Sequence, residues 1–388
     1  PFCDHGIDTT ITVYVNPTPR FTVTIADTIV CDSTTITLDV TDGLGNVEAT
    51  KVYDLVTTYT AGAVLGVQGD GEYAMGTDIT DQLINTTNEV QEVIYYFKYR
   101  LNDPRNGNAP FCDHGIDTSI TVYVNPTPRF TVTIADTIVC DSTNILIDIT
   151  DGLGNVEATK VYDLTTTYTA GAVLGVQGDG EYPMGTDITD QLINTTNEVQ
   201  EVTYYFKYRL NDPRNGNAPF CDHGIDTTIT VYVNPTPRFT VTIADTIVCD
   251  STTITLDVTD GLGNVEATKV YDLTTTYTAG AVLGVQGDGE YPMGTDITDQ
   301  LINTTNEVQE VTYYFKYRLN DPRNGNAPFC DHGIDTSITV YVNPTPRFTV
   351  TIADTIVCDS TNILIDITDG LGNVEATKVY DLTTTYTA

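Results

Sequence analysis

Apolar and polar residues alternate along most of the chain, which is the period of a β-strand with one buried face. Clear examples are the runs Ile11-Thr12-Val13-Tyr14-Val15 and Phe21-Thr22-Val23-Thr24-Ile25. No segment has the three- and four-residue spacing that would place apolar side chains on one face of a helix. The pattern predicts an all-β protein.

Within the first 126 residues the alternation predicts a series of short antiparallel strands. Asp42-Gly43-Leu44-Gly45-Asn46 has the composition of a hairpin turn, and the glycine-rich stretch from Gly62 to Gly76 predicts a loop or a very short strand. Val90 to Leu101 is the longest and most aromatic run, so we expect it in the middle of a sheet. The remaining strands are expected at Phe21 to Ala26, Thr28 to Cys31, Thr34 to Val40, Val47 to Leu55, Thr57 to Ala61, Asp78 to Ile84 and Thr118 to Val124.

The same pattern returns every 109 residues, in copies that start at Pro1, Pro110, Pro219 and Pro328. A repeat of this size can bury its own core, unlike a short solenoid repeat. The copies alternate in small details, which suggests duplication of a two-unit block and a longer array. The fourth copy stops mid-unit at Ala388.

A proline-rich joint recurs between the copies and sets the domain frame. Proline cannot donate to a sheet ladder and restricts the residue before it, so each joint ends one sheet and begins another. We therefore expect domains at 18–126, 127–235 and 236–344, with 1–17 as the last strand of an upstream domain and 345–388 as a partial domain. The joint residues are Asn16, Pro17, Pro19, Pro126, Pro128, Pro235 and Pro237.

Seven to nine short strands in about 109 residues fit an immunoglobulin-like (Ig-like) antiparallel β-sandwich. A jelly roll or an up-and-down barrel of this length is the alternative. The two-proline joint favours the sandwich, because its first and last strands suit end-to-end stacking. Antibody-type packing of Trp against a disulfide is excluded, since the chain has no Trp.

The charge restricts the partners of the chain. It carries 53 acidic and 17 basic residues, a formal net charge of −36. Nucleic acid demands a basic face and anionic head groups attract basic segments, so neither is an expected partner. No apolar run is long enough to span a membrane, and we expect no membrane insertion. Self-repulsion of the acidic repeats favours an extended array.

Each unit has two cysteines, and their even number and fixed spacing predict disulfides and an oxidising compartment. Cys31 with Cys112 would close a loop within one domain, whereas Cys3 with Cys31 would cross a joint. Loop entropy gives about 4.5 and about 3.6 kcal/mol for the two, too close to decide. Domain integrity favours Cys31–Cys112, Cys140–Cys221 and Cys249–Cys330.

Two groups of side chains could hold a metal ion. Cys3-Asp4-His5 and Cys31-Asp32 lack the four tightly spaced ligands of a zinc site. Calcium is the better candidate cofactor, because hard oxygen ligands recur in turns, although such residues also form ordinary turns without metal. The candidate calcium ligands are Asp39, Asp42, Asn46, Asp70, Glu72 and Asp103.

We expect no enzyme, because the one His of each unit has no accompanying nucleophile motif and near-identical copies suit reach and multivalency better than catalysis. Asn85-Thr86-Thr87 matches a glycosylation sequon, but it also reads as a turn.

Part of the repeat resembles a known family. The residues concerned are Asp81-Gln82-Leu83-Ile84-Asn85-Thr86-Thr87, Val93-Ile94-Tyr95-Tyr96, Tyr99, Cys112, Gly115 and Ile120-Thr121-Val122-Tyr123-Val124-Asn125-Pro126-Thr127-Pro128. Together they resemble the second half of the PKD-like domains of Bacteroidetes, which recur in giant surface adhesins, including gliding-motility adhesins of the SprB type. The resemblance implies an Ig-like sandwich, export to the cell surface, typically by the type IX route, and a stalk or adhesive array. The glycine-rich loop from Gly62 to Gly76 departs from that pattern.

We thus expect an extracellular stalk or adhesive repeat array at the cell surface, whose partners are neighbouring repeats and a surface or glycan ligand. Three domains end to end would span on the order of 100–120 Å. The alternatives are a filament formed by self-association through strand edges, and an array of carbohydrate-binding modules.

Overall fold

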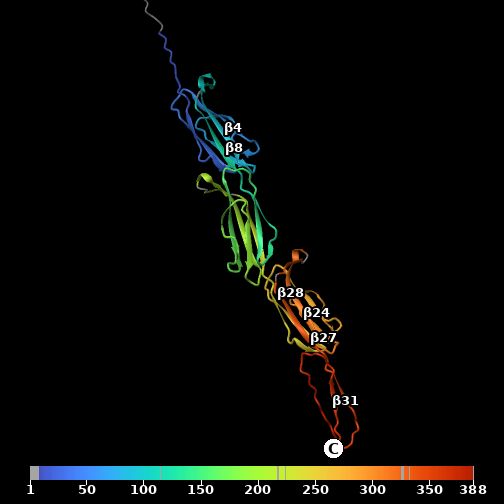
Figure 1. Ribbon diagram of the computed structural model, residues 1–388. Coiled ribbons are helices and arrows are strands. Elements are labelled where there is room, and N and C mark those ends of the chain that lie inside the picture. The colour runs from blue at the N-terminus through green and yellow to red at the C-terminus, as the bar shows by residue number, and fades with distance from the viewer. Residues whose placement is uncertain are drawn as a thin grey trace, which may run out of the picture.

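The computed structural model describes residues 8–387 except 114, 216–217, 223, 325–326 and 332. Three β-sandwiches follow one another along an elongated molecule, and the partial fourth copy extends beyond the third (Figure 1). The strands of the three sandwiches lie between Phe21 and Asn125, Phe130 and Asn234, and Phe239 and Asn343. In the described part of the chain no helix is long and apolar enough to cross a membrane.

The first sandwich consists of two facing sheets. One sheet has the strand order β1-β3-β7-β5, and the other has β2-β10-β8-β4-β6 with β9 paired to the end of β8. Its elements are β1 (Phe21–Thr24), β2 (Ile29–Cys31), β3 (Thr34–Asp42), β4 (Thr50–Tyr59), β5 (Val64–Leu65), β6 (Gly71–Ala74), β7 (Ile79–Asn85), β8 (Gln91–Asp103), the 3₁₀ turn η1 (Pro104–Asn106), β9 (Ala109–Cys112) and β10 (Asp117–Asn125).

The second and third sandwiches repeat this topology. The second contains β11 (Phe130–Ile134), β12 (Ile138–Cys140), β13 (Thr143–Asp151), β14 (Thr159–Tyr168), β15 (Val173–Leu174), β16 (Gly180–Pro183), β17 (Ile188–Asn194), β18 (Gln200–Asp212), η2 (Pro213–Asn215), β19 (Ala218–Cys221) and β20 (Asp226–Asn234). The third contains β21 (Phe239–Thr242), β22 (Ile247–Cys249), β23 (Thr252–Asp260), β24 (Thr268–Tyr277), β25 (Val282–Leu283), β26 (Gly289–Pro292), β27 (Ile297–Asn303), β28 (Gln309–Asp321), η3 (Pro322–Asn324), β29 (Ala327–Cys330) and β30 (Asp335–Asn343). In the partial fourth copy β31 (Phe348–Ile352) pairs with β32 (Ile365–Asp369).

The two sheets pack face to face and bury their alternate side chains, so the chain is a tandem array of Ig-like antiparallel sandwiches, as predicted. The long β8 lies mid-sheet between β10 and β4, also as predicted. Its side chains Tyr95, Phe97 and Tyr99 are fully buried. β2 pairs with β10 in parallel, because the chain crosses from one sheet to the other between β1 and β2.

The predicted hairpin at Asp42-Gly43-Leu44-Gly45-Asn46 is wrong. β3 and β4 belong to opposite sheets, so this segment connects the two layers. The Lys51 ammonium holds it by donating to the Asp42 carboxylate at 2.6 Å and to the Leu44 and Gly45 carbonyls. Leu44 packs against the core. The layer connection, which we call the Asp42–Glu48 loop, is exposed at one end of the sandwich.

Candidate functional site: the junction between domains

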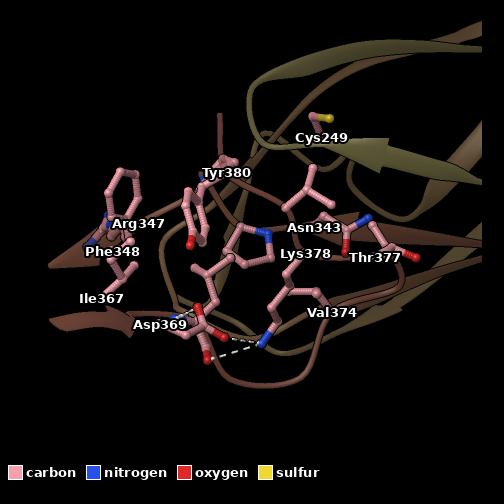
Figure 2. Close-up of a pocket in the computed structure, with 15 residues that line it drawn as sticks. Cys249, Asn343, Arg347, Phe348, Ile367, Asp369, Val374, Thr377, Lys378 and Tyr380 are labelled. Atoms are coloured by element: carbon pink, nitrogen blue, oxygen red, sulfur yellow. Dashed lines mark hydrogen bonds and ion pairs between the residues drawn. The ribbon is translucent and has the colours of Figure 1, made fainter. Parts of the chain in front are cut away.

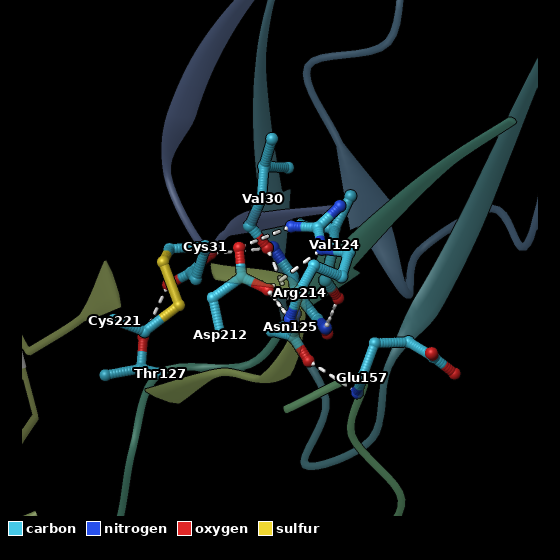
Figure 3. Close-up of a disulfide and its surroundings, with 11 residues drawn as sticks. Val30, Cys31, Val124, Asn125, Thr127, Glu157, Asp212, Arg214 and Cys221 are labelled. Atoms are coloured by element: carbon cyan, nitrogen blue, oxygen red, sulfur yellow. Dashed lines mark hydrogen bonds and ion pairs between the residues drawn. A yellow bond between two sulfur atoms is a disulfide. The ribbon is translucent and has the colours of Figure 1, made fainter. Parts of the chain in front are cut away.

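Two disulfides connect successive sandwiches. Cys31 of the first is bonded to Cys221 of the second (Figure 3). Cys140 of the second is bonded to Cys330 of the third, and in both cases the sequence separation is 190 residues. The predicted pairs Cys31–Cys112, Cys140–Cys221 and Cys249–Cys330 are therefore wrong. The other pairing considered, Cys3 with Cys31, is also absent, because Cys31 is bonded to Cys221; Cys3 itself lies outside the described residues.

The reason is that the two cysteines of one sandwich lie at opposite ends of it. Cys31 is opposite Asn125, at the end of the sheet where β8 begins. Cys112 is opposite Leu101, at the other end of β8. About ten residues of extended strand separate these ends, or roughly 33 Å, whereas a disulfide requires Cα atoms less than about 7 Å apart. Among the described cysteines, Cys112, Cys249 and Cys358 have free thiols.

Backbone hydrogen bonds join the two domains beside the disulfide. Gly154 N donates to Asn88 O at 2.8 Å, and Val90 N donates to Asn155 O at 2.7 Å. Gly154 belongs to the loop of the second domain that corresponds to the Asp42–Glu48 loop. A Cβ at Gly154 would lie 2.6 Å from the Glu89 side chain, so the glycine permits this close approach. The same pairs recur at the next two joints, as Gly263–Asn197 with Val199–Asn264, and Gly372–Asn306 with Val308–Asn373.

The joint asparagine connects the domains from inside. Asn125 is fully buried; its Nδ2 donates to Val30 O at 3.4 Å, and its Oδ1 accepts from Glu157 N of the next domain at 2.9 Å. Asn16 accepts from Glu48 N at 3.2 Å in the corresponding place, although residues 8–20 form no strand. The sequence predicts this Asn only as part of the linker. In the structure its side-chain oxygen accepts a hydrogen bond from the backbone of the following domain.

The prolines of the joint are accompanied by a side-chain contact back to the preceding domain. Thr127, between Pro126 and Pro128, donates to Asp32 Oδ2 at 2.6 Å, and Asp32 Oδ1 accepts from Asn85 N at 2.7 Å. The corresponding residues form this hydrogen bond at the next two joints, where Thr236 donates to Asp141 and Thr345 donates to Asp250. The hydrogen bond from Thr345 holds the pKa of Asp250 below its usual value.

An ion pair crosses the junction near the disulfide. Arg214 sits after β18 of the second domain and contacts Asp27 of the first domain at 3.0 Å and Asp212 at 2.9 Å. The bonds from Arg214 lower the pKa of Asp212, and the two carboxylates raise that of Arg214. Arg323 repeats the arrangement with Asp136 and Asp321. Sequence reasoning missed these residues, because their only signal is a place in polar loops.

Five of the six candidate calcium ligands accept hydrogen bonds from protein donors. Asp42 accepts from Lys51 and Tyr99, Asp70 from Thr57, Glu72 from Arg100, and Asp103 from Arg105. Asp39 accepts from Thr41 on the same strand, and Asn46 lies in the Asp42–Glu48 loop. Within the described residues no three His, Cys, Asp or Glu side chains are grouped to hold a metal ion. Calcium binding thus stays a prediction.

The sequon asparagine Asn85 is buried, and its Nδ2 donates to Glu89 O at 2.8 Å and Val124 O at 2.7 Å. Its amide is therefore engaged in closing the turn after β7. Asn194 and Asn303 make the same bonds. Residues Cys3, Asp4 and His5 of the rejected zinc motif lie outside the described part of the chain.

A cavity of about 450 Å³ lies at the third joint, next to Cys249 and beneath Tyr380 (Figure 2). Phe348, Asp369 and Lys378 also line it, and they correspond to Phe21, Asp42 and Lys51 of the first domain. There Phe21 is covered by Tyr99, with ring centroids 5.6 Å apart, and Tyr53, the counterpart of Tyr380, by Phe97. The cavity is thus uncovered sandwich interior, since the fourth copy has no counterpart of β8 in this sequence.

No protein-family model matches the chain, and no curated protein matches it. Among solved structures it is similar to the titin domains I67–I69, with 8% identity over 84% of this chain and 98% of that chain and a TM-score of 0.42. It is similar to the Escherichia coli adhesin FdeC, with 15% identity, coverage of 86% and 100%, and a TM-score of 0.30. For the E. coli alpha-2-macroglobulin the identity is 12%, the coverage 87% and the TM-score 0.23, and the chain spans 24% of that protein.

Proposed function

We propose that this chain is a segment of a structural stalk or adhesive array in a large extracellular surface protein. The observation that carries the proposal is the junction. At each of two joints a disulfide, an ion pair, two backbone hydrogen bonds and the Asn and Thr contacts fix one sandwich to the next. Flexible linkers would need none of these, so the geometry favours a stiff spacer.

Several features support an extracellular setting. Disulfides persist in oxidising compartments, and the acidic charge of −36 favours solubility and extension. The sequence resemblance adds the finer proposal that the array belongs to a PKD-like adhesin of the kind that Bacteroidetes export to their surface. In this role the repeats hold a ligand-binding part at a distance and offer many weak contacts. The proposal assigns the chain no catalytic activity.

Small-angle scattering of the purified chain tests the proposal. A stiff stalk gives a concentration-independent, rod-like profile whose cross-section is that of one sandwich. A profile of freely jointed domains would overturn it, and concentration-dependent fibres would favour the filament instead. Reduction with a thiol reagent in the same cell provides the internal comparison, because it removes the disulfides and leaves the sequence unchanged.

A further inference from the structure

The two disulfides interleave along the chain. Cys140 lies between Cys31 and Cys221, and Cys221 lies between Cys140 and Cys330. Each bond bypasses 190 residues of backbone, which include most of two successive sandwiches. Tension that passes through a disulfide therefore bypasses that backbone. The consequence depends on how the cysteines are connected between the bonds.

Short segments connect each cysteine of the Cys140–Cys330 disulfide to a free cysteine. Cys112 and Cys140 are 28 positions apart, as are Cys330 and Cys358. The first of these segments contains β10, the proline joint, β11 and β12, so it runs along one sandwich and then along the next. At about 3.3 Å per residue it spans roughly 90 Å in extended form, so it contains little slack. These segments are the shortest covalent route through two domains.

The free cysteines occupy the positions at which the other copies are bonded. Cys112 corresponds to Cys221 and Cys330, and Cys249 and Cys358 correspond to Cys31 and Cys140. We propose that each pairs with the corresponding cysteine of an adjacent sandwich, 190 positions away as in the two bonds described, so that 28-residue segments and disulfides alternate in two covalent ties along the array. Each bond forms as two thiols lose two protons and pass two electrons to a thiol–disulfide oxidant of the exporting compartment.

The ties give the stalk a specific mechanical property. Each tie is already extended in the folded array, so tension is carried along it and strands such as β13 to β18 are not pulled out. Hydrogen bonds and packing then determine the shape of each domain, and covalent bonds determine the length of the array. Reduction removes the bypass and makes the array extensible. This inference rests on the proposed role as a stalk and adds the route by which such a stalk bears tension.

Single-molecule pulling on the full chain tests the ties. The handles are attached through the thiols of Cys112 and Cys358, in a variant with Cys3→Ser and Cys249→Ser to make the labelling unique. With Cys140–Cys330 intact, the route comprises two 28-residue segments and cannot exceed about 200 Å. When both Cys140 and Cys330 are replaced by Ser, the shortest covalent route between the handles at Cys112 and Cys358 contains more than two hundred residues. The maximum extension is then expected to grow by several hundred ångströms.

The matched control removes the other disulfide. With Cys31→Ser and Cys221→Ser the route from Cys112 to Cys358 is unchanged, so the extension is expected to stay near about 200 Å. A second control keeps both disulfides and reduces them during the pulling experiment. If the extension then grows as in the serine variant, loss of the bond and not misfolding explains the result. An equal gain in both variants, or none after removal of Cys140–Cys330, overturns the ties. If the pulling result contradicts the ties but the scattering profile is rod-like, the stalk proposal stands and only the covalent ties are rejected.

Discussion

The interior of each sandwich and the junction between sandwiches are held together by different physics. The interior is a continuous apolar cluster in which the hydroxyl groups of buried tyrosines donate hydrogen bonds. Tyr95 donates to the Asp81 carboxylate at 2.6 Å, and Tyr53 donates to the Thr77 carbonyl at 2.7 Å. The junction is held by directed polar bonds and one disulfide. Burial gives a domain its stability, whereas directed bonds give neighbouring domains a fixed orientation.

The difference teaches that the stability of a domain and the stiffness of the array can be changed separately. Burying a large apolar side chain contributes about 1.5–3 kcal/mol, while an exposed ion pair contributes about 0.2–1 kcal/mol. Changes in the interior should therefore lower unfolding stability and leave the junction of the folded protein intact. Changes at the junction should alter the angle between domains and leave unfolding nearly unchanged.

The largest effect is expected from Phe206→Ala in the second sandwich. Phe206 is fully buried, and its ring lies 5.8 Å from that of Tyr162. Loss of the ring leaves a cavity that should cost about 3–5 kcal/mol of the free energy of unfolding, measured by urea denaturation. The control is Tyr205→Ala on the same strand, whose side chain is 37% exposed. Equal costs for the two would contradict the burial argument.

Neighbouring tyrosines provide a matched test of the buried polar bonds. Tyr204 donates to buried Asp190 at 2.6 Å, whereas Tyr205 donates to exposed Asp226. Tyr204→Phe removes a buried bond to a carboxylate and should cost about 1.5–3 kcal/mol. Tyr205→Phe removes a bond that water can replace, so the unfolding midpoint should hardly move. A larger loss for Tyr205→Phe would contradict the assignment of inner and outer faces.

Extremes of pH should affect the two regions differently. Burial raises the pKa of Tyr53 and of Tyr271 to about 12, above the ordinary value of 10.0. A raised folded-state pKa means that this stabilisation is complete below pH 10 and is lost as the pH rises toward 12. Denaturation midpoints at increasing alkalinity, with tyrosinate absorbance recorded in parallel, should fall in that window. Ionisation of these tyrosines near pH 10 in the folded protein would argue against their burial.

At the junction the pKa shifts have the opposite sign, so acid and not alkali removes the stabilisation. Bonds from Arg214 and Arg323 lower the pKa of Asp212 and Asp321 below 3.8. The stabilisation that these carboxylates provide is present above pH 3.8 and is lost as the pH falls through the lower folded-state values. Scattering below that pH should show looser joints. Unchanged joints at a pH where the carboxylates are protonated would mean that the disulfide and the hydrogen bonds that do not titrate fix the angle.

The smallest effect is expected from Arg214→Ala, which removes the ion pair to Asp27. The side chain of Arg214 is 39% exposed, so solvent screens the pair and its loss should cost at most about 1 kcal/mol. A slight increase in the flexibility of the first junction, seen by scattering at low salt, is the expected result. Arg105→Ala is the control, because Arg105 pairs with Asp103 of its own domain. Greater flexibility in both variants would exclude a junction-specific effect.

The repeat, the proline joints, most of the strands and the sandwich follow from the sequence alone. Each of these depends on local signals: alternation along Phe21 to Ile25, the aromatic run of β8, and prolines that cannot continue a ladder. The predicted break in β4 near Val56 was wrong, because pairing with β8 continues through that position as far as Tyr59. An error of this kind is small, because pairing with a neighbouring strand changes only where a predicted strand ends.

The pairing of the cysteines and the partners at the junction become visible only in the folded array. Cys31 and Cys112 are equally compatible with a bond when only the sequence is considered. The direction of β2 and β9 within the sheet places these cysteines at opposite ends of the sandwich, where each meets a different neighbour. Arg214 and Asp27 are likewise 187 positions apart, and no local pattern connects them. Contacts between domains depend on where strands end in space, which the alternation of residues does not encode.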